Sequence, residues 1–99
     1  MATLNLYLTE GFKDDRVVIS VDGRKVFDGD GITTKKLIGL AKQLSPVAVA
    51  GNMARLEIEL PERGLSTTIS ADLSKGTHVP VAIENGQFTH SVEKKIGFA

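Results

Sequence analysis

The sequence contains no cysteine and no tryptophan. Without cysteine, the chain can form neither a disulfide framework nor a thiolate metal site. Twelve basic residues balance twelve acidic ones, so neither sign of charge is in excess. Proteins that bind nucleic acid by neutralising phosphates normally carry a basic surplus, so the composition argues against that class. The lack of cysteine fits the cytoplasm, which is the location we expect.

Long apolar runs are also missing. The stretch MATLNLYLTEGF at the start has no basic region and no sustained hydrophobic segment, which argues against a signal peptide and a membrane span. A length of 99 residues suits one domain and leaves no room for a second core. We therefore expect residues 1–99 to be a complete, single-domain cytoplasmic protein. A domain cut from a larger secreted protein would have the same composition.

What the sequence does contain is a series of short alternating segments separated by turn signals. The clearest lies in residues 16–31, where Asp22-Gly23 supplies the two positive φ angles of a type I′ hairpin turn. A two-residue loop predicts that Val18 lies opposite Phe27, on the face of the hairpin turned away from the core. Because both side chains are apolar, this second face also needs cover, from another segment or from a partner.

Three further turns are predicted downstream. Residues 47–60 fit a hairpin about Gly51-Asn52, with glycine first as a type II′ turn requires. The turn 61–64 then leads into the strand 65–71, with Leu60 paired to Leu65. Asn85-Gly86 indicates a type I′ hairpin between residues 79–84 and 87–93.

The first strand, residues 3–9, alternates leucine with polar residues. It carries no charge, proline or glycine, which are the features that protect an exposed sheet edge. We therefore expect this strand to lie between two neighbours, or else to take part in self-association.

Segment 33–44 fits two structures. As a helix it would begin at Thr34 as N-cap and end before Pro46. Its apolar face would contain Leu37, Leu40, Ala41 and Leu44. Gly39 and the lysine pair that begins at Lys35, at the positive end of the dipole, disfavour the helix. An extended edge segment fits about equally well, so the pattern leaves a short helix within 33–44 open.

These elements predict an all-β, mainly antiparallel protein. Strands with one apolar face need a second sheet to cover them, so we expect an immunoglobulin-like or transthyretin-like β-sandwich of roughly seven to eight strands. A small closed barrel is the alternative. Neither architecture determines a function.

The loop 28–31, which reads DGDG, is the one hint of metal chemistry. Calcium takes carboxylate and carbonyl oxygens from flexible loops, so Asp28 and Asp30 are the candidate ligands. The EF-hand pattern is not met, because it would require glycine at Thr33 and glutamate at Gly39. Aspartate and glycine are also common simply because turns favour them. Apart from calcium, no cofactor is expected.

A glycan at the same loop is a related alternative. Glycan sites on sandwiches usually present exposed aromatic rings, and this chain has four phenylalanines and one tyrosine. Tyr7 and Phe27 are the rings expected on outward faces, whereas Phe88 is expected in the core. Two rings form a poor platform for a sugar.

Catalytic patterns are absent from the sequence. His78 and His90 are the only histidines, and the last hairpin sets them on opposite faces, His90 at the core margin and His78 in solvent. They would share a metal only if the register shifted by one residue. No GxSxG elbow is present and GDGITTKK fails the P-loop pattern, so we do not expect an enzyme.

Protein interaction is the remaining class. A sandwich has edge strands that can pair with another chain, and Val18, Phe27, Ile96 and Phe98 offer apolar surface. We therefore predict a non-catalytic module that acts through protein–protein contacts, including contacts with a second copy of itself. The alternative is a calcium- or glycan-binding module at the loop 28–31. We expect neither nucleic acid nor membrane as a partner.

Overall fold

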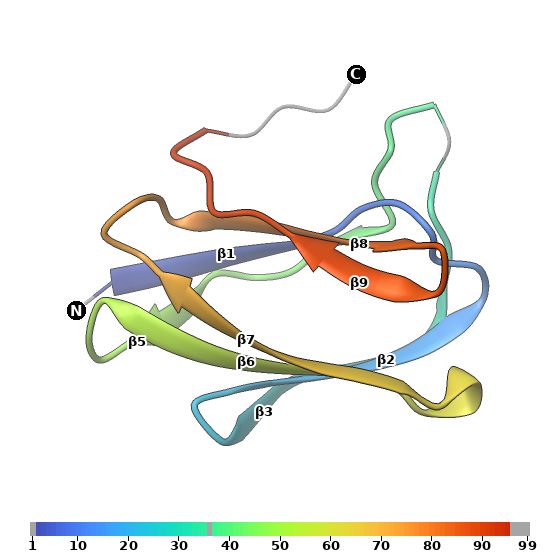
Figure 1. Ribbon diagram of the computed structural model, residues 1–99, viewed down its shortest axis with the longest axis horizontal. Coiled ribbons are helices and arrows are strands. Elements are labelled where there is room, and N and C mark those ends of the chain that lie inside the picture. The colour runs from blue at the N-terminus through green and yellow to red at the C-terminus, as the bar shows by residue number, and fades with distance from the viewer. Residues whose placement is uncertain (1, 36, 96–99) are drawn as a thin grey trace.

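The computed structural model describes residues 2–35 and 37–95, which form two β-sheets packed face to face (Figure 1). The first sheet contains β1 (Ala2–Leu8), β4 (Lys42–Gln43), β5 (Val47–Val49), β8 (His78–Glu84) and β9 (Gln87–His90). The second contains β2 (Asp15–Val21), β3 (Arg24–Ile32), β6 (Met53–Leu60) and β7 (Leu65–Asp72). A short 3-10 helix, η1 (Pro61–Arg63), joins β6 to β7. The predicted all-β sandwich is confirmed.

The chain alternates between the two sheets. The strand orders are β4-β1-β8-β9, with β5 also paired to β1, and β3-β2-β6-β7. An immunoglobulin sandwich keeps its first two strands in one sheet. Here β1 and β2 lie in different sheets. The connectivity therefore differs from that of an immunoglobulin sandwich.

β1 occupies the middle of the first sheet. It runs parallel to β8 on one side and antiparallel to β4 and β5 on the other. β4 and β5 are two pieces of one edge, interrupted around Pro46, and this split brings the number of strands in residues 2–35 and 37–95 to nine. The prediction that the charge-free first strand lies between neighbours is confirmed.

One cluster of buried apolar side chains lies between the sheets. Alternate residues of β1, β2, β6 and β8 fill it, as the alternating pattern predicts. The largest fully buried side chains are Leu4, Leu6, Leu8, Ile19, Leu56, Ile58, Leu60, Val17, Val79 and Val81. Burial of each such side chain contributes about 1.5–3 kcal/mol of transfer free energy, so this cluster is the main source of stability.

Both predicted type I′ turns are present. Asp22 and Gly23 have φ angles of 51° and 83°, and Asn85 and Gly86 have φ angles of 52° and 75°. In each turn both central residues are left-handed, which is the condition that the type I′ turn sets. The predicted pairing of Leu60 with Leu65 across η1 is also confirmed.

The predicted hairpin about Gly51-Asn52 is wrong. β5 pairs with β1 in the first sheet, whereas β6 pairs with β2 and β7 in the second. Gly51 does not have the positive φ that a type II′ turn requires. Residues 50–52 instead carry the chain from one sheet to the other.

The register of the first hairpin also differs from the prediction. Beyond the pair Ser20–Lys25, a bulge at Val26 shifts β3 by one residue. Val18 therefore pairs with Asp28 rather than with Phe27. Phe27 now lies opposite Ile19, and its ring packs against the core instead of facing outward.

The described residues of segment 33–44 contain no helix. An isolated bridge between Lys35 and Leu40 closes a turn, and β4 follows. Leu37, which would lie on the apolar face of a helix, is 94% exposed. The Thr34 hydroxyl does not cap a helix: it donates to the Thr9 carbonyl at 2.6 Å and accepts the Phe12 N–H at 3.1 Å. The helix is therefore wrong, and among the described residues of this segment only 42–43 form an extended edge strand.

Candidate interaction surface

Sheet edges carry unpaired backbone N–H and C=O groups, so they are where another chain can pair. In the part of the chain that the structure describes, the edges are β3, β7, β9 and the interrupted β4 and β5. β9 has four residues, and β4 and β5 have two and three. The pairing of β3 with β2 is interrupted by two irregularities. Short strands and bulges protect an edge from pairing, so these three edges are protected.

β7 has none of these protective features. Its eight residues pair one-to-one with β6, from Asp72 opposite Met53 to Leu65 opposite Leu60, without a bulge. Its sequence LSTTISAD contains no proline or glycine, and its one charge is the terminal Asp72. β7 therefore presents a long, regular edge of the kind that accepts an added strand.

The hydrogen-bond pattern identifies the groups on this free edge. The Leu73 N–H donates to the Asn52 carbonyl at 2.6 Å, which makes these two residues a hydrogen-bonded pair. Such pairs alternate along an antiparallel ladder, so the odd-numbered residues of β7 also bond to β6. The free edge presents the backbone N–H and C=O groups of Ser66, Thr68 and Ser70.

The same three residues carry their side chains on the outer face of the second sheet, where they are exposed. Thr68 lies opposite Glu57 and Ser66 opposite Glu59. A shallow hollow runs between these glutamates and β7. On its outer face the β7 edge thus presents uncharged hydroxyl groups, and the acidic side chains of Glu57 and Glu59 lie on the neighbouring strand β6.

The inner side of the edge is apolar. Ile69 and Ala71 are buried in the core, whereas Leu65 and Thr67 are half-buried. A strand added along β7 would cover the remaining exposed area of Leu65 and Thr67. Coverage of that apolar area would favour pairing.

Asp28, one of the two predicted calcium ligands, is held by cationic side chains. Arg16 Nε and Nη2 donate to its two carboxylate oxygens at 3.1 and 3.0 Å, and Lys25 Nζ lies 3.5 Å from Oδ2. The hydrogen bond from Arg16 lowers the pKa of Asp28, and the same contact raises the pKa of Arg16. The two cations already neutralise this carboxylate, which is unfavourable for binding a divalent cation.

Asp30, the second predicted ligand, is exposed on the same strand. Within residues 2–35 and 37–95, no group of three or more histidine, aspartate or glutamate side chains is arranged to hold a metal ion. Calcium in proteins takes six to eight oxygen ligands, so a site here would need oxygens beyond these two side chains.

The fold separates the two described residues of the predicted apolar surface. Val18 lies half-buried on the outer face of the second sheet, whereas Phe27 packs against the core. Ile96 and Phe98 lie outside the described residues. Val18 and Phe27 therefore do not form a common patch.

The two histidines are separated, but their exposures are the reverse of the prediction. His90 is exposed, whereas His78 is partly buried beside Tyr7. The Tyr7 hydroxyl and His78 Nδ1 form a hydrogen bond of 2.8 Å, and the Tyr7 side chain is itself buried. Tyr7 is therefore not a surface ring on which a sugar could stack.

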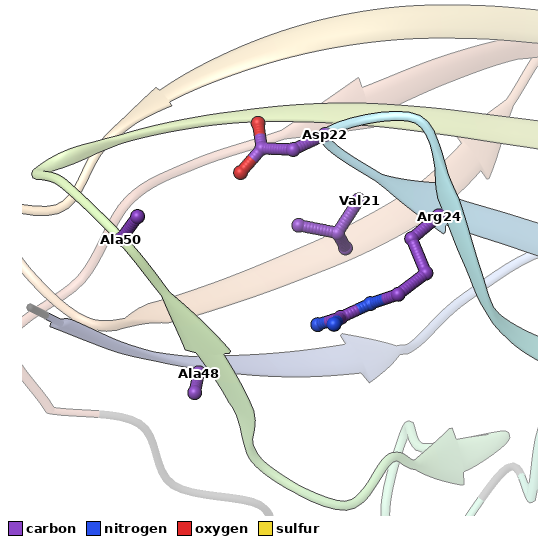
Figure 2. Close-up of a pocket in the computed structure, with 5 residues that line it drawn as sticks. All are labelled: Val21, Asp22, Arg24, Ala48 and Ala50. Carbon is purple, nitrogen blue, oxygen red and sulfur yellow. The ribbon is translucent and has the colours of Figure 1, made fainter.

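A hollow of about 360 Å³ lies where the β2–β3 turn approaches β5 (Figure 2). It is lined by Val21, Asp22, Arg24, Ala48 and Ala50. The Asp22 carboxylate already accepts the Arg55 N–H at 3.0 Å. Small-molecule pockets bring several free polar groups to one point. Here the lining contains two charged side chains, and of these Asp22 already has a hydrogen-bond partner among the described residues. This hollow does not support a ligand site.

The β7 edge was not predicted from the sequence, although the sequence contains the pattern that indicates it. Residues 65–71 lack charge, proline and glycine, which is the criterion that we applied only to the first strand. The criterion identifies strands that need partners on both sides. Among the described strands, β1 has partners on both sides, whereas β7 has one partner, β6.

Among the described residues, no helix has the length and apolar character needed to cross a bilayer. Comparisons with protein-family models, with curated protein sequences and with solved structures found no match. The function of the domain therefore has to be inferred from its geometry.

Proposed function

We propose that this domain is a non-catalytic interaction module, which binds by pairing the free edge of β7 with an extended strand of another polypeptide. The observation that carries the proposal is the contrast between β7, with eight regularly paired residues, and the short or irregular strands at the other edges. Added strands gain affinity from main-chain hydrogen bonds, and Ser66, Thr68 and Ser70 direct their backbone groups outward.

The side chains support the same role. Hydroxyl groups on the outer face both donate and accept hydrogen bonds, so they tolerate many partner residues. The half-buried Leu65 and Thr67 add apolar contact on the inner face. The absence of cysteine favours the cytoplasm as the place where this contact occurs.

A proline at position 68 tests the proposal at the level of the backbone. Thr68→Pro removes an N–H group that β6 does not use, and proline at such a position of an edge strand is compatible with the fold. Thr68→Val is the matched control, because it keeps the N–H group and the β-branched shape. Circular dichroism and thermal melting establish that both variants fold.

The measurement is co-purification from the protein's own source cells, with the wild type and both variants carrying a tag. A second copy of the wild type carries a different tag, so that self-association is also detected. We expect the wild type and Thr68→Val to retain one polypeptide in stoichiometric amount, and folded Thr68→Pro to lose it. Equal recovery with Thr68→Pro would overturn the proposal. So would a wild-type protein that purifies alone and monomeric.

A further inference from the structure

We infer that the strand paired with β7 is β7 of a second copy of this chain, in an antiparallel dimer whose two-fold axis passes beside Thr68. The inference rests on the proposed function, because it names the partner of that same edge. The dimer joins the second sheets of the two copies into one continuous sheet, β3-β2-β6-β7 followed by the same strands in reverse order.

The register follows from the backbone. Ser66, Thr68 and Ser70 direct both their N–H and their C=O groups to the free edge, whereas the Asp72 carbonyl already accepts the Lys75 N–H at 3.1 Å. These three residues therefore form the hydrogen-bonded pairs. An antiparallel pairing centred on Thr68 uses all three in each copy: Thr68 faces its equivalent, and Ser66 faces Ser70. With the centre at Ile69, Ser66 would face Asp72, whose carbonyl already accepts the Lys75 N–H. With the centre at Thr67, Ser70 would face Gly64, which lies outside β7. Either shift leaves at least one of the three residues without a complete hydrogen-bonded pair. The backbone thus selects one register.

The side chains of β7 are complementary to one another in that register. On the outer face, hydroxyl groups meet hydroxyl groups, and Thr–Thr and Thr–Ser pairs across strands are favourable. On the inner face, Leu65 lies opposite Ala71 and Thr67 lies opposite Ile69 of the second copy. The two half-buried residues of each copy therefore meet the two buried ones, and a single apolar layer continues across the axis.

The charge distribution permits the contact. Residues 65–71 carry no charge, and the whole chain has no formal net charge. Glu57 and Glu59 lie one strand back from the edge, so the glutamate rows of two copies are separated by three strand spacings, about 14 Å. Beyond a Debye length of about 8 Å, such exposed charges are largely screened at physiological ionic strength.

The symmetry of the contact also favours a closed dimer over an open-ended assembly of many copies. A two-fold contact uses the same edge on both subunits and therefore ends with the dimer. The outermost strands of the joined sheet are the two copies of β3, whose pairing with β2 is irregular. β3 is thus protected against further pairing, and the assembly does not extend into a fibre.

Sedimentation of the purified protein over a range of concentrations is the first test. We expect a reversible dimer. Thr68→Glu should weaken it roughly tenfold or more, because the two new glutamates would face each other across the axis with their Cα atoms about 5.5 Å apart, and their like charges would repel. Thr68→Gln is the matched control, since it has a similar size and no charge, and its dimer should persist. Added salt should partly restore the Thr68→Glu dimer.

Cysteine pairs test the register, because the chain has no cysteine of its own. Facing residues of a hydrogen-bonded pair lie about 5.5 Å apart, within the range that a disulfide spans. Thr68→Cys should therefore cross-link to itself under mild oxidation. Ser66→Cys and Ser70→Cys should cross-link when the two variants are mixed. Neither should do so alone, since equivalent copies of either residue lie about 14 Å apart.

The outcomes separate this inference from the proposed function. A monomeric wild type that nevertheless retains a different polypeptide through Thr68 would overturn the second-copy inference and leave the edge-pairing function intact. A dimer that Thr68→Glu and Thr68→Pro leave unchanged would also overturn the inference, because the contact would then lie on another surface. Self-cross-linking of Ser66→Cys would exclude the register centred on Thr68.

Discussion

Arg63 and Asp15, which are 48 residues apart in the sequence, form a bidentate ion pair. The pair connects η1, which joins β6 to β7, with the first residue of β2. Arg63 Nε and Nη2 donate to the two Asp15 carboxylate oxygens, both at 2.8 Å. Asp15 is 4% exposed, and its Oδ2 also accepts the Lys13 N–H at 2.8 Å. Because Arg63 ends η1, and Gly64 alone separates it from β7, this pair helps to set the point at which the proposed interaction edge begins.

Loss of Arg63 should therefore lower stability. Arg63→Met leaves the Asp15 carboxylate buried without its counter-charge, and we expect the free energy of unfolding to fall by about 2 kcal/mol. Arg16→Met is the control, because its partner Asp28 is more exposed and exposed ion pairs contribute little to stability. Urea denaturation monitored by circular dichroism measures both. Equal effects of the two substitutions would show that the Asp15 site is not the stronger of the two.

The Arg16–Asp28 pair should be visible in the pH dependence. The hydrogen bond from Arg16 lowers the pKa of Asp28 below its usual value of 3.8, so the stabilisation is present above that value and is lost as the pH falls through the lower pKa of the folded state. Carboxylate titration by NMR should give a depressed midpoint for Asp28, and Arg16→Gln should move it back toward 3.8.

Asp72 provides an internal control for that titration. Its pKa is also lowered, by hydrogen bonds from the Ser74 hydroxyl and then from the Ser74 N–H. Arg16→Gln should leave the Asp72 midpoint unchanged, whereas Ser74→Ala should raise it. A midpoint for Asp28 that does not respond to Arg16→Gln would contradict the assigned cause.

Calcium should not stabilise the protein. Arg16 and Lys25 already occupy the Asp28 carboxylate, so binding of calcium would have to displace two cationic contacts. We expect the melting temperature to be the same in millimolar calcium and in chelator, because a ligand that does not bind the native state cannot shift it. An increase with calcium that Asp28→Asn and Asp30→Asn each abolish would restore the calcium-binding alternative.

Turns that depend on two residues could be predicted from the sequence. Asp22-Gly23 and Asn85-Gly86 set their own φ angles, so the turn type follows from the residues themselves. The bulge at Val26 could not be predicted in this way. It changes which residues oppose each other without altering the apolar pattern around it, and it turns Phe27 toward the core.

Elements whose structure depends on distant residues were harder to predict. Gly51-Asn52 suits a hairpin and a crossing between sheets equally well, and the sheet to which β5 belongs decides between them. The position of β7 at an edge depends likewise on the order of all the strands. In the regularly paired strands β6 and β7, the alternation of residues predicted which side chains face outward. The tertiary arrangement determines which backbone groups remain unpaired.

Segment 33–44 offers a final test of how distant contacts determine local structure. Thr34 is fixed by Thr9 and Phe12, after which Leu37 projects into solvent with 94% exposure and Leu44 enters the core with 6% exposure. In the amphipathic helix both leucines would share one buried face. In the observed structure, Leu37→Ser should change the free energy of unfolding by less than about 0.5 kcal/mol, whereas Leu44→Ala should lower it by about 3 kcal/mol. Urea denaturation of the two variants measures the difference, and comparable losses would indicate that the segment packs as a helix.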